Sequence, residues 1–409
     1  MKIDLQDPEL TRQLAVIRRG VVDLLPEEEF VEKLYFSIKS KKPLRVKQGF
    51  DPTAPDIHLG HTVGLRKLRQ FQDLGHQVVL IIGDYTGLVG DPSGRSATRP
   101  QLTYEQIMQN AETYQNQFFK VVDKSKTEIH FNGEWFVKMG LRDIMGLASK
   151  FTIARLLERD DFEKRYRQGI PIAMHEFFYP LMQAYDSVMI SADVEIGATE
   201  QTFNLMAGRQ IQEAFGQPPQ CVLTLPILVG VDGVNRMSKS MGNYIGIDEP
   251  PREIFGKVMS ISDNLIYSYW ELLTDVDAAR LAEIKAKLDS KEYNPMDIKK
   301  DLAATLVGMY HTREAGLEAR EEFERVFSDK GLPDEIPEFS LSALGKKIWV
   351  VKLLTETGTV KSGGEARRLI KGGGLYMNNE RITDESLEID LSEGMLFKAG
   401  KRRFFKIVG

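Results

Sequence analysis

The chain has 409 residues, of which 42% are hydrophobic and 28% are charged, and its formal net charge is −5. This composition is that of a globular protein with two or three domains, and it excludes a surface that is basic throughout. The single cysteine, Cys221, excludes an internal disulfide framework and a multi-cysteine zinc site. Because the N-terminus is polar and no run of about 18 apolar residues occurs, we expect no membrane span and a cytoplasmic location.

Strand and helix signals alternate along the first half of the chain. Residues 1–44 indicate helix and loop. Apolar runs then predict strands over residues 44–50, 76–84, 126–132 and 221–230. Amphipathic patterns between them predict helices over residues 61–75, with Gly75 as the C-terminal cap, and 104–122. This alternation predicts an open, mostly parallel α/β sheet joined by right-handed crossovers.

The other segments set the expected domain organisation. Residues 1–248 are predicted to form the α/β domain, with a mostly helical insertion at about 134–190. A helical domain is expected over residues 249–330, and the turn-forming residues of 331–342 predict a linker. Residues 343–409 are expected to form a compact unit of their own.

Two of the six histidines stand three residues apart in FDPTAPDIHLGH, which follows the first predicted strand. If a helix begins near Asp56, His58 and His61 lie on one face of its first turn, where free N–H groups and the helix dipole favour anions. Two imidazoles there can donate hydrogen bonds to phosphate oxygens, and Gly60 lets a flat base approach the backbone. Two surface histidines are the alternative. A metal site would lack a third nearby ligand, and the phosphate-loop and dinucleotide fingerprints are both absent.

A second motif lies in the glycine-flanked loop GVNRMSKSMGN, residues 233–243. Its Arg236 and Lys239 suit a flexible clamp for pyrophosphate, and a solvated loop is the simpler alternative. Together, HLGH at 58–61 and RMSKS at 236–240 resemble the HIGH and KMSKS signatures of class I aminoacyl-tRNA synthetases. The resemblance implies a Rossmann-like parallel-sheet catalytic domain with a helical insertion, followed by an α-helical domain.

The segment FFYPLMQAYDSVMI, residues 177–190, gives the best indication of the substrate. Tyr179, Gln183 and Asp186 fall at positions i, i+4 and i+7, which places them on one face of a predicted helix. Gln183 and Asp186 interrupt an apolar run, and burying them is unfavourable unless a partner hydrogen-bonds to them. A substrate with a phenol hydroxyl and an ammonium group would supply such partners. A half-exposed helix with these residues facing water is the alternative.

The same segment resembles the YxxxQxxD motif of tyrosyl-tRNA synthetases, and GDYTGLVGDPSGRSATRP and GATEQTFN resemble that family too, most closely its second bacterial branch. The resemblance covers the whole chain. It implies tyrosine-binding residues at Lys47, Thr86, Asp91, Asn132, Tyr179, Gln183, Asp186 and Gln201. It implies ATP-binding residues at Gly49, Asp51, Gly60, Glu200, Met237 and Lys239. It implies catalytic residues, which meet the phosphates or hold the leaving pyrophosphate, at Thr53, His58, His61, Arg95, Arg99, Arg236 and Lys239.

Within these sets the resemblance also implies individual roles. Asp186 would accept a hydrogen bond from the substrate phenol, and Tyr179, Gln183 and Asp91 would bind the ammonium group. Glu200 would contact the ribose of ATP. Three positions depart from the family pattern: Lys47 stands where the better-known branch has a tyrosine, Ala198 replaces a glycine, and Arg236 replaces a lysine. A lysine at position 47 could donate to the phenol oxygen, and its role is left open here.

The family reaction has two steps, which the resemblance implies for this chain. The tyrosine carboxylate attacks the α-phosphorus of ATP and pyrophosphate leaves, and then a ribose hydroxyl of tRNA(Tyr) attacks the adenylate. No side chain is a candidate covalent nucleophile, so positioning and electrostatics would supply the catalysis. Mg2+ would bind through the ATP phosphates, no zinc is expected, and the family's dimeric state implies a homodimer through the helical insertion.

The tail is more basic than the rest of the chain. Residues 341–409 hold thirteen Lys and Arg against eight Asp and Glu, whereas the whole chain has a net charge of −5. This asymmetry indicates a local nucleic-acid-binding surface, and a small basic domain with no ligand is the alternative. The tail resembles a small α+β S4 RNA-binding domain, which implies phosphate contacts from Arg367, Arg368 and Lys371.

Three other functions stay open at this stage. A tryptophanyl-tRNA synthetase would share the fold, but the Gln183 and Asp186 face and the S4-like tail argue against it. A non-catalytic RNA-binding protein on the same scaffold would have no need of His58, His61 and Lys239. A different nucleotidyl transferase would have no use for an RNA-binding tail.

Overall fold

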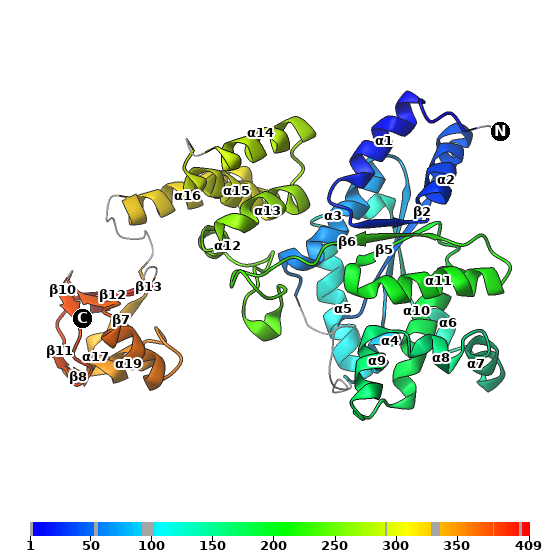
Figure 1. The fold of residues 1–409 in the computed structure, drawn as a ribbon. Coiled ribbons are helices and arrows are strands. Elements are labelled where there is room, and N and C mark those ends of the chain that lie inside the picture. Colours follow the sequence, from blue (N-terminus) through cyan, green and yellow to red (C-terminus); the bar gives the residue numbers. More distant parts are fainter. Residues whose placement is uncertain are drawn as a thin grey trace. The chain divides into compact units, whose positions relative to one another are not determined.

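The computed structural model describes residues 3–52, 56–91, 102–290, 293–328, 336–378, 380–400 and 403–409. It divides into two compact units, Met1–Leu317 and Glu318–Gly409, which are described separately (Figure 1). The division falls within the long helix α16 (Arg313–Ser328). No helix among the described residues is both long and apolar enough to cross a membrane.

A six-stranded sheet forms the centre of the first unit, in the order β1-β6-β5-β2-β3-β4. Its strands are β1 (Asp23–Leu25), β2 (Arg45–Phe50), β3 (Gln77–Ile82), β4 (Thr127–Phe131), β5 (Val194–Ala198) and β6 (Cys221–Leu225). All neighbours pair in parallel except β1, which is antiparallel to β6. The predicted open, mostly parallel sheet is therefore confirmed. The prediction of only helix and loop over 1–44 was wrong for the three residues of β1, and β5 was not predicted.

The strand order reverses between β5 and β2. From β2 the chain proceeds to β3 and β4 on one side, and from β5 it proceeds to β6 on the other. In open α/β sheets a crevice forms at the carboxyl ends of the strands at such a point, and ligands bind there. The residues that follow β2 and β5 are therefore the first place to look for a site.

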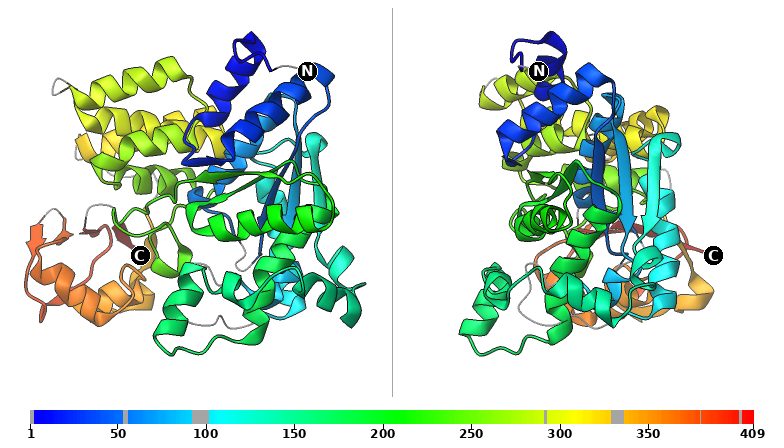
Figure 2. Two further views of the ribbon diagram at one scale, coloured as in Figure 1. Left: turned by 45° about the vertical axis from the view of Figure 1, so that its right-hand side comes forward. Right: turned by 90° about the vertical axis from the view of Figure 1, so that its right-hand side faces the viewer.

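Helices cover both faces of the sheet (Figure 2). The crossover helices α3 (Leu59–Asp73) and α5 (Tyr104–Phe118) lie on one face, and α10 (Phe178–Met189) and α11 (Thr202–Ala214) lie on the other and pack against each other. Gly75, at φ +90°, follows the end of α3 as predicted. The remaining elements of this region are α1 (Pro8–Arg18), α2 (Glu27–Ser40), α4 (Thr86–Val89), α6 (Gly133–Phe136), α7 (Leu141–Ala148), α8 (Ile153–Leu156) and α9 (Asp160–Arg167).

Helices alone follow the sheet, as the apolar periodicity predicts. They are α12 (Pro251–Met259), α13 (Ile266–Leu273), α14 (Ala278–Asp289), α15 (Pro295–Tyr310) and α16. Pro251 and Pro295 begin their helices, where a missing N–H removes no intrahelical hydrogen bond. α12 and α15 pack against each other and bury Phe255, Leu302 and Leu306.

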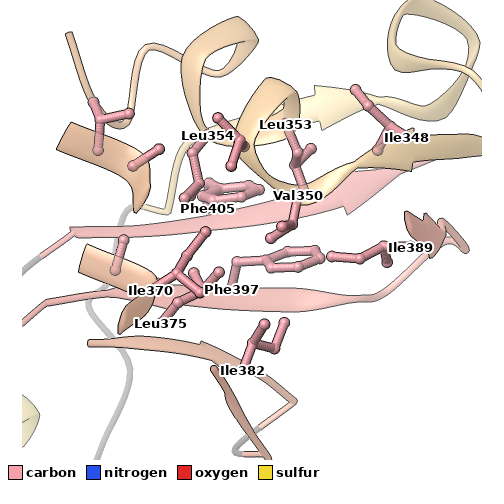
Figure 3. Packing of buried hydrophobic residues seen from close by; sticks show 14 of the residues in the cluster. Ile348, Val350, Leu353, Leu354, Ile370, Leu375, Ile382, Ile389, Phe397 and Phe405 are labelled. Carbon is pink, nitrogen blue, oxygen red and sulfur yellow. The ribbon is translucent and has the colours of Figure 1, made fainter. Parts of the chain in front are cut away.

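The second unit has its own apolar core (Figure 3). The rings of Phe397 and Phe405 stack at its centre, with centroids 4.7 Å apart. Two helices, α18 (Val350–Glu356) and α19 (Gly363–Lys371), pack beside a five-stranded and a two-stranded sheet. The strands are β7 (Glu338–Ser340), β8 (Lys347–Trp349), β9 (Leu375–Met377), β10 (Glu380–Ile382), β11 (Glu388–Asp390), β12 (Leu396–Ala399) and β13 (Arg403–Val408), and α17 (Leu341–Leu344) is a single turn. β7 pairs in parallel with β13, so part of the predicted linker belongs to this sheet.

Candidate active site

The two motif histidines lie at the start of α3, in a reciprocal cap. The helix begins at Leu59 rather than near Asp56, so His58 is the N-cap residue and does not lie on the first turn. Its Nδ1 accepts a hydrogen bond from Gly60 N at 3.1 Å, and His61 Nδ1 accepts one from His58 N at 3.3 Å. The two rings stack with centroids 3.9 Å apart. Since both Nδ1 atoms accept, Nε2 carries the proton in each neutral ring.

Both imidazoles are neutral near pH 7. Burial, together with the nearby His61 and Lys239, lowers the pKa of His58 to about 2. Burial, helped by Lys239, lowers the pKa of His61 to about 4. The rings therefore offer Nε2–H donors to an oxyanion and carry no net charge of their own.

A cavity of about 450 Å³ opens at the carboxyl ends of β2, β5 and β6, at the strand-order reversal. It brings together segments that lie up to about 190 residues apart in the sequence. Twelve of the predicted site residues line it: Gly49, Asp51, His58, Gly60, His61, Asp91, Tyr179, Glu200, Gln201, Arg236, Met237 and Lys239. The position of this cavity follows the general rule for open α/β sheets.

Carboxylates hold both cations of the 233–243 loop. Arg236 Nη1 lies 3.0 Å from each carboxylate oxygen of Glu200, and Lys239 Nζ lies 3.1 Å from Asp56 Oδ2. Asn243 braces the loop by accepting a hydrogen bond from Ser238 N at 2.8 Å. A phosphate that enters the cavity between these groups could replace the carboxylate as the partner of each cation.

The predicted tyrosine face is buried on α10. Tyr179, Gln183 and Asp186 all lie within this helix and are at most 9% exposed. The hydroxyl of Tyr179 donates to Asp51 Oδ2 at 2.8 Å, and Thr86 Oγ1 donates to Asp51 Oδ1 at 2.8 Å. Asp51 therefore links the end of β2 to the polar face of α10.

Asp186 does not line the cavity and lies among hydrogen-bond donors. Its Oδ1 accepts from Trp135 Nε1 at 3.0 Å, and its Oδ2 accepts from Asn132 Nδ2 at 3.3 Å. Asn132 Nδ2 also donates to Thr86 Oγ1 at 2.9 Å, so its orientation is fixed. Burial raises the pKa of Asp186 to about 7, although the Lys47 charge and these two hydrogen bonds oppose the rise. A buried carboxyl with a pKa near neutrality is typical of a residue that takes part in binding or catalysis.

Lys47 is fully buried and directed at groups of the protein. Its Nζ donates to Gln183 O at 2.9 Å and to Ser187 Oγ at 2.8 Å, and it forms an ion pair with Glu195 Oε1 at 2.9 Å. An ammonium group has three N–H donors, and three acceptors surround this one. This geometry assigns Lys47 to the support of α10 rather than to a direct hydrogen bond with a ligand.

Four residues of the site were not predicted: Arg159, Asn204, Glu195 and Trp135. Glu195 gave one usable signal, because it is a carboxylate inside the short apolar strand VEIGA. Asn204 is buried on α11, and although it is the last residue of the GATEQTFN segment, no role was predicted for it. Trp135 and Arg159 lie in the helical insertion. Trp135 binds the distant Asp186, and Arg159 binds the distant Asn204 and Asp91 as well as the neighbouring Asp161.

Some predicted site residues lie elsewhere. Thr53, Arg95 and Arg99 fall outside the described residues. Arg367, Arg368 and Lys371 lie on α19 of the second unit and are exposed. The Arg367 guanidinium lies 5.6 Å from the centroid of the Trp349 ring, and Lys371 Nζ lies 3.2 Å from Glu385 Oε1. In the part of the chain that the structure describes, no group of three or more His, Cys, Asp or Glu could hold a metal ion.

Comparison with known proteins covers the whole chain. A family model of class I tRNA synthetases (W and Y) matches residues 39–328, and a model of the tyrosine–tRNA ligase SYY-like C-terminal domain matches residues 329–407. The tyrosine–tRNA ligase of Carboxydothermus hydrogenoformans is 53% identical over 404 residues, which cover 98% of each chain. That of Thermotoga maritima is 51% identical over 397 residues, which cover 97% of each chain.

Solved structures show the same fold. The chain resembles the tyrosyl-tRNA synthetase of Archaeoglobus fulgidus, solved in complex with L-tyrosine, with a TM-score of 0.62 and 24% identity over 76% of this chain and 99% of that chain. It also resembles a C-terminally truncated mitochondrial tyrosyl-tRNA synthetase from Aspergillus nidulans, with a TM-score of 0.64 and 20% identity over 79% of this chain and 95% of that chain. At these identities the likeness shows the fold alone.

Proposed function

The chain belongs to the tyrosine–tRNA ligases of the class I tRNA synthetases, and we propose that its cavity performs the two-step reaction of that family. L-tyrosine reacts with ATP to give tyrosyl-adenylate and pyrophosphate, and the tyrosyl group is then transferred to the 3′-terminal ribose of tRNA(Tyr). One observation carries this proposal. The cavity that holds the two imidazoles and the two loop cations is also lined by Tyr179, which lies on α10 with the buried Gln183 and Asp186.

In the first step the tyrosine carboxylate attacks the α-phosphorus in line, and the bond to the pyrophosphate oxygen breaks. The Nε2–H groups of His58 and His61 donate to phosphate oxygens as negative charge develops on them. Arg236 and Lys239 leave Glu200 and Asp56 and hold the departing pyrophosphate. Neutral imidazoles suit this role because they form hydrogen bonds without binding the ground-state anion as strongly as a cation would.

The two substrates occupy the two ends of the site. The residues assigned to ATP are Gly49, Asp51, Gly60, Glu200, Met237 and Lys239, all of which line the cavity. Tyrosine lies with its phenol at Asp186 and its ammonium group at Tyr179, Gln183 and Asp91, with Gln201 beside it. Mg2+ would bind through the ATP phosphates and neutralise part of their charge, an arrangement that needs few protein ligands. The polar groups of the cavity fit a phosphate chain, since both loop cations and both imidazoles line it.

The direct test is aminoacylation. Purified protein, ATP, magnesium and labelled tyrosine should yield acid-precipitable tyrosyl-tRNA with bacterial tRNA. No product should form when ATP is omitted or when the tRNA lacks its 3′-terminal adenosine. Charging of a different amino acid would contradict the proposed substrate.

Tyrosine affinity should rise between pH 6 and pH 8. If the phenol hydroxyl donates to Asp186, only the ionised carboxylate binds, and each pH unit below a pKa of about 7 weakens binding about tenfold. Calorimetry should therefore give a Kd about tenfold higher at pH 6 than at pH 8. Trp135→Phe removes a hydrogen bond that favours the ionised form, so it should move the transition to higher pH. A Kd for tyrosine that does not change over this pH range would contradict the assignment of Asp186 as the acceptor of the phenol hydroxyl.

Asp56→Asn should leave adenylate formation nearly intact. The Asp56 and Lys239 side chains are 51% and 24% exposed, and an ion pair of this kind contributes about 1 kcal/mol or less. Freeing Lys239 should therefore change the KM for ATP by less than about fivefold, measured by ATP–pyrophosphate exchange. A loss of several orders of magnitude would show that Asp56 takes part in the reaction itself.

The second unit should serve tRNA binding and not tyrosine activation. A chain that ends at residue 335 lacks the whole tail core, including β7. Its rate of pyrophosphate exchange should stay within about twofold of the full chain, whereas kcat/KM for tRNA charging should fall about tenfold or more, because phosphate contacts are lost. Equal loss of both activities would mean that the tail has a structural role.

A homodimer through the helical insertion is also proposed, and the reaction would take place in the cytoplasm, where tRNA is used. Several large apolar side chains of the insertion are more than 60% exposed on this chain: Val137, Leu141, Met145, Ile153, Tyr166 and Met174. Such side chains gathered on one segment are typical of an association surface. Sedimentation should give a dimer that Leu141→Asp with Met145→Asp dissociates, and a monomer for the unaltered chain would contradict the proposal.

A further inference from the structure

We propose that three buried residues for which the resemblance implied no role form a network that positions the ligands of the tyrosine ammonium group: Arg159, Asn204 and Glu195. The inference rests on the proposed function and adds to it. These residues do not line the cavity. They act through Gln183 and Asp91, the side chains assigned to the substrate ammonium group.

At one end of this hydrogen-bonded network, Glu195 on β5 is the acceptor. Glu195 is fully buried, and its charge is balanced by Lys47, whose Nζ lies 2.9 Å from its Oε1. A carboxylate accepts hydrogen bonds and does not donate them. Gln183 therefore turns its Nε2 toward Glu195 Oε1, at 3.1 Å. The ion pair of Lys47 and Glu195 therefore lies next to the Gln183 amide.

The other end of the network is a donor in the helical insertion. Arg159 is 4% exposed, and its Nη1 donates to Asn204 Oδ1 at 3.0 Å. A guanidinium only donates, so the Asn204 amide must present Nδ2 on its other side, where it donates to Gln183 Oε1 at 3.0 Å. With a pure donor at one end and a pure acceptor at the other, neither amide can flip without setting two like groups against each other.

This arrangement matters for the substrate. An amide oxygen accepts two hydrogen bonds, and the second is the one assigned to the ammonium group. A flipped Gln183 would present an N–H donor to a cation instead. The same Arg159 lies 3.1 Å from Asp91 Oδ1 through its Nη2, so one guanidinium positions both ammonium ligands. Positioning of this kind is expected to set affinity for the amino group and not for the phenol.

Asn204→Leu tests the network, because leucine has a similar volume and no hydrogen-bonding group. Two ligands are compared by calorimetry: tyrosine, and 3-(4-hydroxyphenyl)propionate, which lacks the amino group. The variant should bind tyrosine about tenfold to a hundredfold more weakly, the order of a misplaced hydrogen bond to a charged group. Its affinity for the analogue should change by less than about threefold, and its KM for ATP should be unchanged.

Gln212→Met is the matched control. Gln212 is also a buried amide on α11, and it donates to Ala192 O at 2.9 Å and accepts from Gln220 N at 2.7 Å, outside the network. This variant should keep the full preference for tyrosine over the analogue. If Asn204→Leu does not fold, Asn204→Asp is measured instead. A carboxylate at this position sets an acceptor against Gln183 Oε1, so this variant should also lose affinity for tyrosine and not for the analogue.

Equal weakening of both ligands in the Asn204 variants would overturn the positioning role, and so would an unchanged affinity for tyrosine. An equally large selective loss in Gln212→Met would overturn it too. Failure of the proposed function has a different signature. In that case the unaltered chain would show no tyrosine-dependent pyrophosphate exchange before any variant is made.

Discussion

Asp186→Ala is expected to lower kcat/KM for tyrosine activation by about three orders of magnitude or more. The carboxylate accepts hydrogen bonds from Trp135 and Asn132 in a buried site, and it is assigned to the substrate phenol. Alanine leaves the substrate phenol unpaired in a buried polar site, and a mismatch of this kind lowers kcat/KM by up to about 10⁴–10⁵. It also leaves Trp135 and Asn132 without their acceptor, which lowers stability by about 1–3 kcal/mol for each group. Pyrophosphate exchange at saturating ATP measures the loss.

Two observations would separate this role from general destabilisation. The KM for ATP should change little, since Asp186 does not line the nucleotide cavity. Asp186→Asn should also fail, because its amide must set its own N–H donors against Trp135 or the oriented Asn132. Near-normal activation by either variant, in protein with an unchanged melting temperature, would remove Asp186 from the phenol site.

The same site accounts for rejection of phenylalanine. Phenylalanine would fill the pocket and leave Asp186 without the phenol hydroxyl. Tyrosyl-tRNA synthetases are themselves the known example of this rule, and their preference of about 10⁵ for tyrosine without editing is an established property of the family. A preference of the same order is expected of this chain.

Lys239→Ala is expected to slow adenylate formation by about 10²–10³, the usual effect of removing one group that stabilises developing charge. Lys239 lines the cavity, and its charge adds to the effect of burial in lowering the pKa values of His58 and His61. A single-turnover measurement with pre-bound tyrosine isolates this step from product release.

Lys257→Ala is the matched control for this prediction. Lys257 lies on α12, pairs with Glu249 at 2.6 Å, and shares the Tyr244 ring with Lys239, but it does not line the cavity. It should change the rate by less than about threefold. An unchanged single-turnover rate in Lys239→Ala would contradict the assignment of this lysine to pyrophosphate.

The sheet and the motif-bearing helices could be predicted because their signals are local. A continuous apolar run such as QVVLII indicates a buried parallel strand, and a period of 3.6 indicates α3 and α10. The strands that were missed or misread break those patterns. β1 has three residues, and Glu195 interrupts the hydrophobic run of β5.

The start of α3 shows a different limit. The sequence favours a helix that begins near Asp56. The helix instead begins after His58, whose imidazole serves as the cap acceptor. Histidine is not among the usual N-cap residues, so propensity gives no warning of this role. The consequence is functional, because capping occupies both Nδ1 atoms and leaves Nε2 as the N–H donor of each ring.

The contacts among the buried polar residues Lys47, Glu195, Arg159 and Asn204 could not be predicted, because they depend on partners that the fold brings together. Lys47 and Glu195 are 148 residues apart, and Arg159 and Asn204 are 45 apart. From the sequence alone, Lys47 was a possible hydrogen-bond donor to the phenol oxygen of the substrate. Only the parallel pairing of β2 with β5, which sets Lys47 opposite Glu195, reveals that its charge is balanced within the protein.

ATP–pyrophosphate exchange with tyrosine, phenylalanine and tryptophan in turn requires both the nucleotide cavity and the tyrosine face, so it tests both together. Rapid exchange is expected with tyrosine and none above background with the other two. Exchange with tryptophan, or no exchange with tyrosine from folded protein with magnesium, would contradict the proposed function.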